Sequence, residues 1–388
     1  MGRFADHKAP LLAGTVASIT GTAASAGLVL TALTSLGATS SQTASAIFVL
    51  IAMYGLLSIG LSWRFKMPIS IVWSTPGAAL LISSGALHLP FSSAAGAFIF
   101  TGVLLLLTGL WPALGRLVSA IPKPIASAML AGVIFNFCIA PFQSAADFPW
   151  IVLPAILVWL VLYKYATIWA TPAAMVIIFT LTALDKGISL AGMNLLPQVE
   201  LVAPTFDLGA IVSIGIPLYL VTMASQNIPG VAIMKSFGYE VPFKQVMTAT
   251  GLSAVFAGFF GGFSMNLAAI TAALNANDHA HKDPARRWLS SVYGGYVYLV
   301  IALFAVPTVA FVLQAPKELV LAAAGLALLG TIISALSSAV EVVELRLPAM
   351  VAFLVAASGV SAFGIGSAFW ALIAGLVVWG WLSLRGKN

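Results

Sequence analysis

The sequence predicts an all-α polytopic membrane protein. Charged residues make up 7% of the 388 residues, hydrophobic residues make up 61%, and the mean hydropathy is +1.07. A typical soluble domain carries about 25% charged residues, so lipid must be the main solvent around this fold. The apolar runs are continuous over about 15–25 residues, which is the length of membrane-spanning helices. The strands of a membrane barrel would instead alternate apolar and polar residues.

Fourteen apolar spans are expected, seven in each half of the chain. The first seven are 11–36, 43–63, 70–84, 93–112, 118–139, 148–164 and 170–185. The second seven are 208–234, 246–261, 265–276, 288–312, 319–340, 347–361 and 366–384. The segment 186–207 is more polar and contains Pro197 and Pro204, so we expect a connector there. The halves 1–185 and 208–388 are then expected to insert in opposite orientations, as an inverted repeat.

The distribution of positive charge supports this count. If the N-terminus is cytoplasmic, fifteen of the seventeen Lys and Arg residues lie on the cytoplasmic side, and only Lys186 and Lys317 lie outside. Such a bias is typical of inner-membrane proteins. We therefore expect a multi-pass protein of a bacterial inner membrane with both termini in the cytoplasm. Residues 1–10 show no small-residue cleavage site, so no removable signal peptide is expected.

Two short, interrupted spans occupy the third position of each half. The first contains Trp73, Ser74, Thr75, Pro76 and Gly77, and the second contains Ser264, Met265, Asn266 and Leu267. The residues before Ser74 are β-branched or aromatic and favour a short strand before a half-helix. Interrupted spans at matching positions of inverted repeats are typical of transporter binding sites. Pro and Gly are, however, also common in ordinary membrane helices.

Half-helices that begin inside the membrane present unpaired N–H groups and the positive end of a dipole. Two such ends can hold an anion without Lys or Arg. Pro76 is tolerated in a first turn, and Gly77 would let a ligand approach the backbone. The polar side chains here can cap the helices or donate to a carboxylate, although hydroxyls more often bond their own helix backbone. They are Ser74, Thr75, Ser264 and Asn266.

Polar residues in two other spans add candidates for the same site. Gln226 and Asn227 are amides in an apolar run just before Pro229, and they need protein, water or substrate as partners. A helix–helix hydrogen bond is the alternative role. The flanking candidates are Ser225 and Ile228. In the first span, Thr22 and Ser25 lie near mid-depth, where small residues are more often packing contacts.

Several function classes are excluded. All eleven Asp and Glu and all four His are expected in loops or at helix ends, so a buried hydrolase would have no base for its nucleophile. No Walker or Rossmann motif appears, which argues against an ATP-driven pump. Cys138 is the only cysteine, so neither a disulfide nor a metal site is expected. The scattered positive charges form no nucleic-acid-binding stripe. We expect no enzyme, cofactor, metal or nucleic-acid partner.

Three strings together resemble the benzoate membrane transporters of bacteria (BenE). They are residues 68–80, 224–231 and 266–273, and weaker ones are 283–287 and 364–370. The resemblance covers nearly the whole chain and implies symport of benzoate, an aromatic carboxylate, with protons. More distantly, the layout is similar to the uracil and sulfate-anion transporter fold. That similarity implies a core of about 11–112 and 208–312 and a gate of about 118–185 and 319–384.

The chain departs from uracil-type transporters in one respect. Those members carry carboxylates on the eighth and tenth spans, where this chain has Ser225 to Asn227 and Ser264 to Asn266. The loss of negative charge suits an anionic substrate and removes the obvious proton acceptor. We expect the substrate carboxylate near Gly77 and Asn266, with Gln226 and Asn227 as donors. The ring is expected on Met265, Leu267 and Ile228.

Two routes for the coupling proton and three other functions remain open. In the first route the proton travels on the substrate carboxyl. In the second it binds Glu341 or Glu344, although solvated loop charges are the simpler interpretation of these two residues. A nucleobase carrier would be expected to keep an acidic residue. A passive organic-anion channel would conduct continuously, and a membrane enzyme would need the catalytic residues that are missing. Assembly as a homodimer is also open.

Overall fold

The structure is a computed structural model that describes residues 2–111, 113–114, 120–188, 196–197, 199–268, 270–360, 362–363 and 365–385. Within these residues, seven helices are long and apolar enough to cross a membrane, and one further pair would do so as a span bent by 58°. The all-α membrane fold is therefore confirmed. The total of fourteen crossings stays a prediction. The start of the predicted span 118–139 and part of the predicted connector lie outside the described residues.

The predicted spans coincide with a helix or with a strand followed by a helix, except 208–234 and 288–312, each of which is divided into several elements. The first half contains α1 (Gly2–Ser35), α2 (Ser40–Phe65), β1 (Ile71–Trp73), α3 (Thr75–Ser84), α4 (Phe91–Leu110), α6 (Lys123–Asp147), α7 (Pro149–Tyr165) and α8 (Thr167–Lys186). The second half contains α9 to α11 within Leu208–Ser236, α12 (Phe243–Gly258), β2 (Met265–Leu267), α13 (Ile270–Ala276), α14 (Trp288–Ala302), α15 (Ala305–Gln314), α16 (Lys317–Val340), α17 (Arg346–Ala357) and α18 (Ser367–Arg385).

The predicted span 288–312 is broken rather than continuous. Helix α14 ends at Ala302, and α15 begins at Ala305 with an axis turned by 58°. Pro307 explains the break, because it has no N–H to donate and its ring clashes with the carbonyl four residues earlier, that of Leu303. The sequence-based prediction of one continuous span over 288–312 is therefore wrong at this proline.

Two wide turns interrupt the segment Leu208–Ser236. It consists of α9 (Leu208–Ala210), the π-helical turn η2 (Ile211–Gly215), α10 (Ile216–Thr222), a second π-helical turn η3 (Met223–Asn227) and α11 (Ile228–Ser236). Each π turn is followed by a proline, Pro217 or Pro229, which cannot close a normal α turn. Such π turns often occur at functional sites. Here η3 rotates two neighbouring amides into different surroundings.

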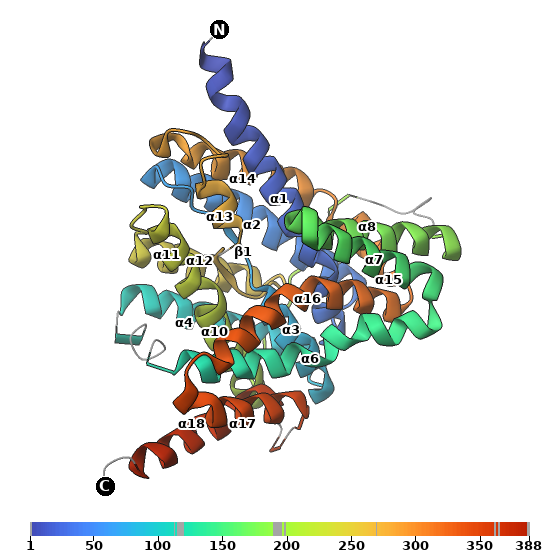
Figure 1. Cartoon of the computed structure of the whole chain (residues 1–388), viewed down its shortest axis with the longest axis vertical. Helices are drawn as coiled ribbons and strands as arrows, with labels where there is room; N and C mark the ends of the chain where they lie inside the picture. Colours follow the sequence, from blue (N-terminus) through green and yellow to red (C-terminus); the bar gives the residue numbers. More distant parts are fainter. Residues whose placement is uncertain are drawn as a thin grey trace.

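The helices pack as two groups. In one group, α4 packs on α12 and α14 packs on both α1 and α2. In the other, α6 packs on α16 and α17, α7 packs on α8, and α18 packs on α17. Figure 1 shows β1 in the middle of the molecule, with α7 and α8 at one side and α17 and α18 at the C-terminal end. Small residues allow close contact, since a Cβ on Gly251 of α12 would lie 2.3 Å from the backbone nitrogen of Leu106 on α4.

The two strands form one antiparallel pair at the centre. Ile71 faces Leu267, Val72 faces Asn266 and Trp73 faces Met265. The predicted strand before each half-helix is thus confirmed. Because the strands come from corresponding places in the two halves, the pair brings the two interrupted spans side by side.

Candidate functional site

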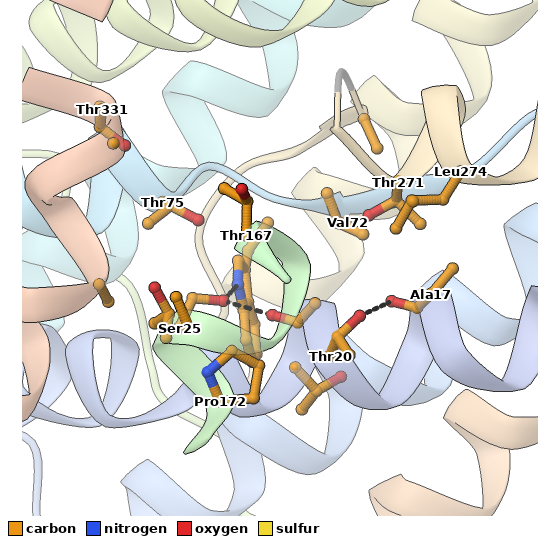
Figure 2. Close-up of a pocket in the computed structure, with 18 of the residues that line it drawn as sticks. Ala17, Thr20, Ser25, Val72, Thr75, Thr167, Pro172, Thr271, Leu274 and Thr331 are labelled. Atoms are coloured by element: carbon orange, nitrogen blue, oxygen red, sulfur yellow. Dashed lines mark hydrogen bonds between the residues drawn. The ribbon is translucent and has the colours of Figure 1, made fainter. Parts of the chain in front are cut away.

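A cavity of about 340 Å³ opens between the two groups of helices. Its walls come from α1, α2, the β1–α3 junction, η3, α13 and α14 on one side, and from α7, α8 and α16 on the other. In the view of Figure 2, Thr331 of α16 and Thr75 of α3 lie toward the left, and Thr271 of α13 lies toward the right. The site therefore has walls from both groups of helices and from both interrupted spans.

The β1–α3 junction borders this cavity. Ser74 caps α3, because its Oγ accepts a hydrogen bond of 3.0 Å from the backbone N–H of Gly77, and Pro76 lies in the first turn. Thr75, the first residue of α3, lines the cavity together with Val72 and Trp73. The Thr75 hydroxyl bonds to no other described residue. The positive end of the α3 dipole and a free hydroxyl are thus presented together.

Gly77 serves packing in this structure. A Cβ at this position would lie 2.7 Å from Cδ1 of Leu218, and Gly77 itself is buried. The expected close approach of a ligand to the Gly77 backbone is therefore not what the structure shows, because a leucine side chain takes that space.

Strand β2, before α13, is enclosed by protein. Met265, Asn266 and Leu267 are all 0% exposed. The N–H of Leu267 donates to Oδ1 of Asn227 over 2.9 Å, and Ser264 Oγ lies 3.1 Å from Thr222 Oγ1. The amide of Asn266 donates only a long bond of 3.4 Å to the Leu267 carbonyl, and its Oδ1 has no partner among the described residues. Strand β2 is thus held by the neighbouring span and does not line the cavity, whereas Ala268 just after it and Thr271 of α13 do.

The two amides of η3 have different surroundings. Gln226 is half-buried, lines the cavity and bonds to no other described residue. Asn227 is 0% exposed, accepts from Leu267 and donates to Sδ of Met223 over 3.4 Å. The sequence offered two roles for these amides, a structural hydrogen bond or a contact with substrate. Asn227 has the structural role, and Gln226 is an amide without a protein partner in the cavity wall.

Helix α1 contributes a fixed wall and a free hydroxyl. Ser25 accepts a bond of 2.7 Å from Nε1 of Trp73 and donates to the carbonyl of Gly21 over 2.9 Å. Thr22, three residues earlier, is half-buried, lines the cavity and has no partner among the described residues. Ser25 therefore orients the Trp73 ring, while the Thr22 hydroxyl stays available.

The structure brings together only some of the predicted site residues. Those that line the cavity are Thr22, Ser25, Thr75 and Gln226. Those that are buried and do not line the cavity are Ser74, Pro76, Gly77, Asn227, Ser264, Met265, Asn266 and Leu267. Ser225 and Ile228 border a separate cavity of about 460 Å³ beside α6. Met265, Leu267 and Ile228, expected to hold a ring, thus do not meet at one place.

Aromatic residues of the cavity were missed by the sequence analysis. They are Tyr54 on α2, Tyr298 on α14, and Trp159 and Tyr163 on α7. Two of them could have been predicted from the sequence. Tyr54 and Tyr298 lie in the middle of apolar spans, whereas tyrosine is usually enriched at the membrane interfaces. The α7, α8 and α16 residues gave no such signal, because their sequences read as ordinary apolar helices.

The cavity is neutral. Among the described residues, no Asp, Glu, His, Lys or Arg lines it. Glu341 lies at the end of α16 and forms an ion pair of 3.7 Å with Lys123, and both side chains are mostly exposed. Glu344 is also exposed. Any charge that enters the cavity is therefore met by dipoles, hydroxyls and one amide rather than by a side-chain counter-ion.

Comparisons with known proteins identify a family. The model of the BenE family, described as benzoate membrane transport protein, matches residues 5–380. Inner membrane protein YdcO of Escherichia coli is 38% identical over 99% of this chain and 98% of its own. Benzoate membrane transport protein of Acinetobacter baylyi is 32% identical over 83% of this chain and 82% of its own.

Solved structures agree on the fold. The transmembrane domain of a cyanobacterial bicarbonate transporter, BicA, superposes with a TM-score of 0.59 at 16% identity, covering 94% of this chain and 97% of that one. SLC26A9 superposes with a TM-score of 0.62 at 13% identity, covering 97% of this chain and 66% of that one. At such identities the likeness shows the fold alone. The family model's match over residues 5–380, together with relatives of 38% and 32% identity, shows that the chain belongs to the BenE family of membrane transport proteins.

Proposed function

We propose that this protein is a secondary active transporter that imports benzoate or a related aromatic carboxylate across a bacterial inner membrane. The observation that carries the proposal is the neutral cavity between the two groups of helices, which combines aromatic rings with unpaired hydroxyl and amide groups. Concave sites with apolar walls and a few polar groups are typical of small-molecule sites. The printed name of the Acinetobacter relative supports benzoate as the first substrate to try.

The substrate carboxylate binds at the start of α3. Thr75 and Gln226 supply a hydroxyl and an amide without other partners, and Thr22 supplies a second hydroxyl. The N-terminal end of α3 adds a favourable dipole. This placement differs from the expected one near Gly77 and Asn266, because Leu218 fills the space beside Gly77 and Asn266 is 0% exposed.

The substrate ring packs on Val72 and Trp73. Trp73 is fixed by its bond to Ser25, and its ring stands edge-to-face against Tyr54 with centroids 5.5 Å apart. Aromatic rings favour such edge-to-face or offset contacts with one another. A flat aromatic acid is thus met by a preformed aromatic wall rather than by a flexible one.

Transport follows from movement between the two groups of helices. Residues of about 11–112 and 208–312 act as a core that carries the substrate, and residues of about 118–185 and 319–384 act as a gate. The cavity lies where the two groups meet, with Trp159, Pro172 and Thr331 on the gate side. An elevator-like or rocking motion of the core against this wall exposes the site to each side in turn.

The substrate binds as the carboxylate and takes up the coupling proton in the cavity, so that the proton crosses on the substrate carboxyl. An aromatic carboxylic acid resembles a side-chain carboxyl, whose pKa is about 4. No carboxylate or histidine among the described residues lines the cavity. Glu341 and Glu344 are solvent-exposed and lie outside the cavity wall. Symport then requires no titrating group of the protein.

Uptake of labelled benzoate into proteoliposomes tests this function. The lumen is made alkaline in one series and equal in pH to the medium in another, and protein-free liposomes measure the diffusion of neutral benzoic acid. The proposal expects saturable uptake that the pH gradient drives and that other aromatic acids block. Uptake no faster than in empty liposomes, with folded protein, would remove benzoate as the substrate.

A further inference from the structure

A glycine in the cavity wall leaves open space. Gly330 lies in α16 and lines the cavity together with Ala327 and Thr331, which is labelled in Figure 2. Ala327 lies three residues before Gly330 and four before Thr331, so these residues share the face of α16 that borders the cavity. A Cβ added at Gly330 would meet no atom of another described residue within 4 Å. The missing side chain therefore leaves room in the cavity and not in a contact between helices.

Packing does not explain this glycine. Gly325, on the same helix, shows a packing role, because a Cβ there would lie 2.2 Å from the carbonyl oxygen of Phe137 on α6. Gly330 has no such neighbour among the described residues, and its backbone is helical without a positive φ. Glycine in a helix interior is less favourable than alanine. Gly330 thus weakens the helix without improving a contact, and the open space beside it is what it contributes.

The cavity has more room than one benzene ring needs. Its volume is about 340 Å³, and sites that bury most of a drug-sized ligand begin at about 300 Å³. In the proposed arrangement the carboxylate lies at Thr75 and the ring lies on Val72 and Trp73, all on the core side. Gly330 belongs to the opposite, gate-side wall. The space beside Gly330 is therefore available to a part of the substrate that benzoate lacks.

We infer that Gly330 determines the size of the substrate, and that the space beside it admits aromatic carboxylates with a second fused ring in addition to benzoate. This inference rests on the proposed function. Apolar Ala327 and Pro172 belong to the same gate-side wall, and no charged residue among those described lines the cavity. An apolar ring is the kind of group that such a wall favours, because burial of apolar surface is favourable.

Competition against labelled benzoate in proteoliposomes tests the inference. The competitors are unlabelled benzoate, 1-naphthoate and 2-naphthoate, and the two naphthoates differ in the direction of the second ring. With wild-type protein, we expect at least one naphthoate to halve benzoate uptake at a concentration no higher than that of unlabelled benzoate. Liposomes loaded with that naphthoate should also take up labelled benzoate faster than unloaded ones, because a transported acid leaves on the carrier and frees it to return with benzoate.

A graded series at Gly330 tests whether this residue sets the size limit. Gly330→Ala, Gly330→Val and Gly330→Leu fill the space by increasing amounts. The measured quantity is the half-inhibiting concentration of naphthoate divided by that of benzoate. We expect this ratio to rise along the series, by at least about tenfold for Gly330→Leu, since a hydrophobic pocket distinguishes even a methylene by about that factor. Gly330→Ala should keep or raise the melting temperature, because alanine favours a helix.

Gly60→Leu is the matched control. Gly60 lies within α2, is exposed, and has no atom of another described residue within 4 Å of an added Cβ, but it does not line the cavity. The substitution adds the same side chain to the same kind of helical glycine. It should keep the wild-type ratio of the two half-inhibiting concentrations.

The outcomes separate the inference from the proposed function. If wild-type protein takes up benzoate and neither naphthoate competes, or if they compete without accelerating uptake from inside, larger acids are not substrates and the transporter assignment stands. An equal loss of competition by benzoate and naphthoate along the Gly330 series would also overturn the inference, because the glycine would then serve the movement of the helices. If wild-type protein takes up no aromatic acid, both proposals fail together.

Discussion

The two strand–helix junctions of this protein have related sequences and different surroundings. At β1–α3, Val72, Trp73 and Thr75 line the cavity. At β2–α13, Met265, Asn266 and Leu267 are 0% exposed, and Leu267 is bonded to Asn227 of the neighbouring span. The strands pair with each other, so the junctions are neighbours, yet strand β1 lines the cavity and strand β2 is buried, and the second junction reaches the cavity only through Ala268 and α13.

This difference teaches that matching positions in two repeats need not share a role. Antiparallel pairing needs a partner strand whose position is fixed. The bonds from Asn227 to Leu267 and between Thr222 and Ser264 fix β2 from the side of the eighth span. The first junction can then present its helix terminus and hydroxyl to a ligand, because the second supplies the support.

The largest effect is expected from Asn227→Ala, which removes the support of the second junction. It leaves the buried N–H of Leu267 unpaired, so the free energy of unfolding should fall by about 1–3 kcal/mol. Thermal melting in detergent would show this as a drop of several degrees, with less folded protein recovered. A melting temperature equal to that of wild type would contradict the supporting role of Asn227.

Gln226→Ala, one residue earlier, should act on uptake and not on stability. The side chain has no partner in the protein to lose. We expect benzoate uptake at low substrate concentration to fall about tenfold, the loss of one good hydrogen bond to a charged group. The melting temperature should stay at the wild-type value. Normal uptake in folded Gln226→Ala would exclude this amide from the site.

Thr75→Val at the first junction and Ser264→Ala at the second test whether the two junctions differ in their contact with substrate. Valine keeps the shape of threonine and removes the hydroxyl, so KM for benzoate should rise about two- to tenfold, as for one neutral hydrogen bond. Ser264→Ala at the second junction is its counterpart and should leave KM unchanged. A larger change in KM for Ser264→Ala than for Thr75→Val would reverse the assignment of the two junctions.

The smallest effect is expected from Glu341→Gln combined with Glu344→Gln. Both carboxylates are exposed, and Glu341 pairs with the exposed Lys123. Exposed ion pairs contribute little, and neither group reaches the cavity. The dependence of uptake on the pH gradient should therefore equal that of wild type. A flattened dependence in the double variant would show that the protein, and not the substrate, carries the coupling proton.

Most of the architecture could be predicted from the sequence, because apolar length and turn chemistry are local properties. The strands at Ile71–Trp73 and Met265–Leu267 and the first-turn Pro76 are examples. Which neighbouring side chain faces the cavity could not be predicted. Gln226 and Asn227 have the same chemistry and adjacent positions, and their different roles depend on the π turn and on the partner strand, which are set by tertiary packing.

Cysteine protection tests the difference between the junctions most directly. Cys138, the only native cysteine, is 5% exposed and can be replaced by alanine. In that background, Thr75→Cys and Ser264→Cys are treated with a charged thiol reagent, with and without benzoate. We expect the reagent to modify Thr75→Cys, benzoate to slow that modification, and Ser264→Cys to stay unmodified. Modification of Ser264→Cys that benzoate slows, with no protection at Thr75→Cys, would contradict the account.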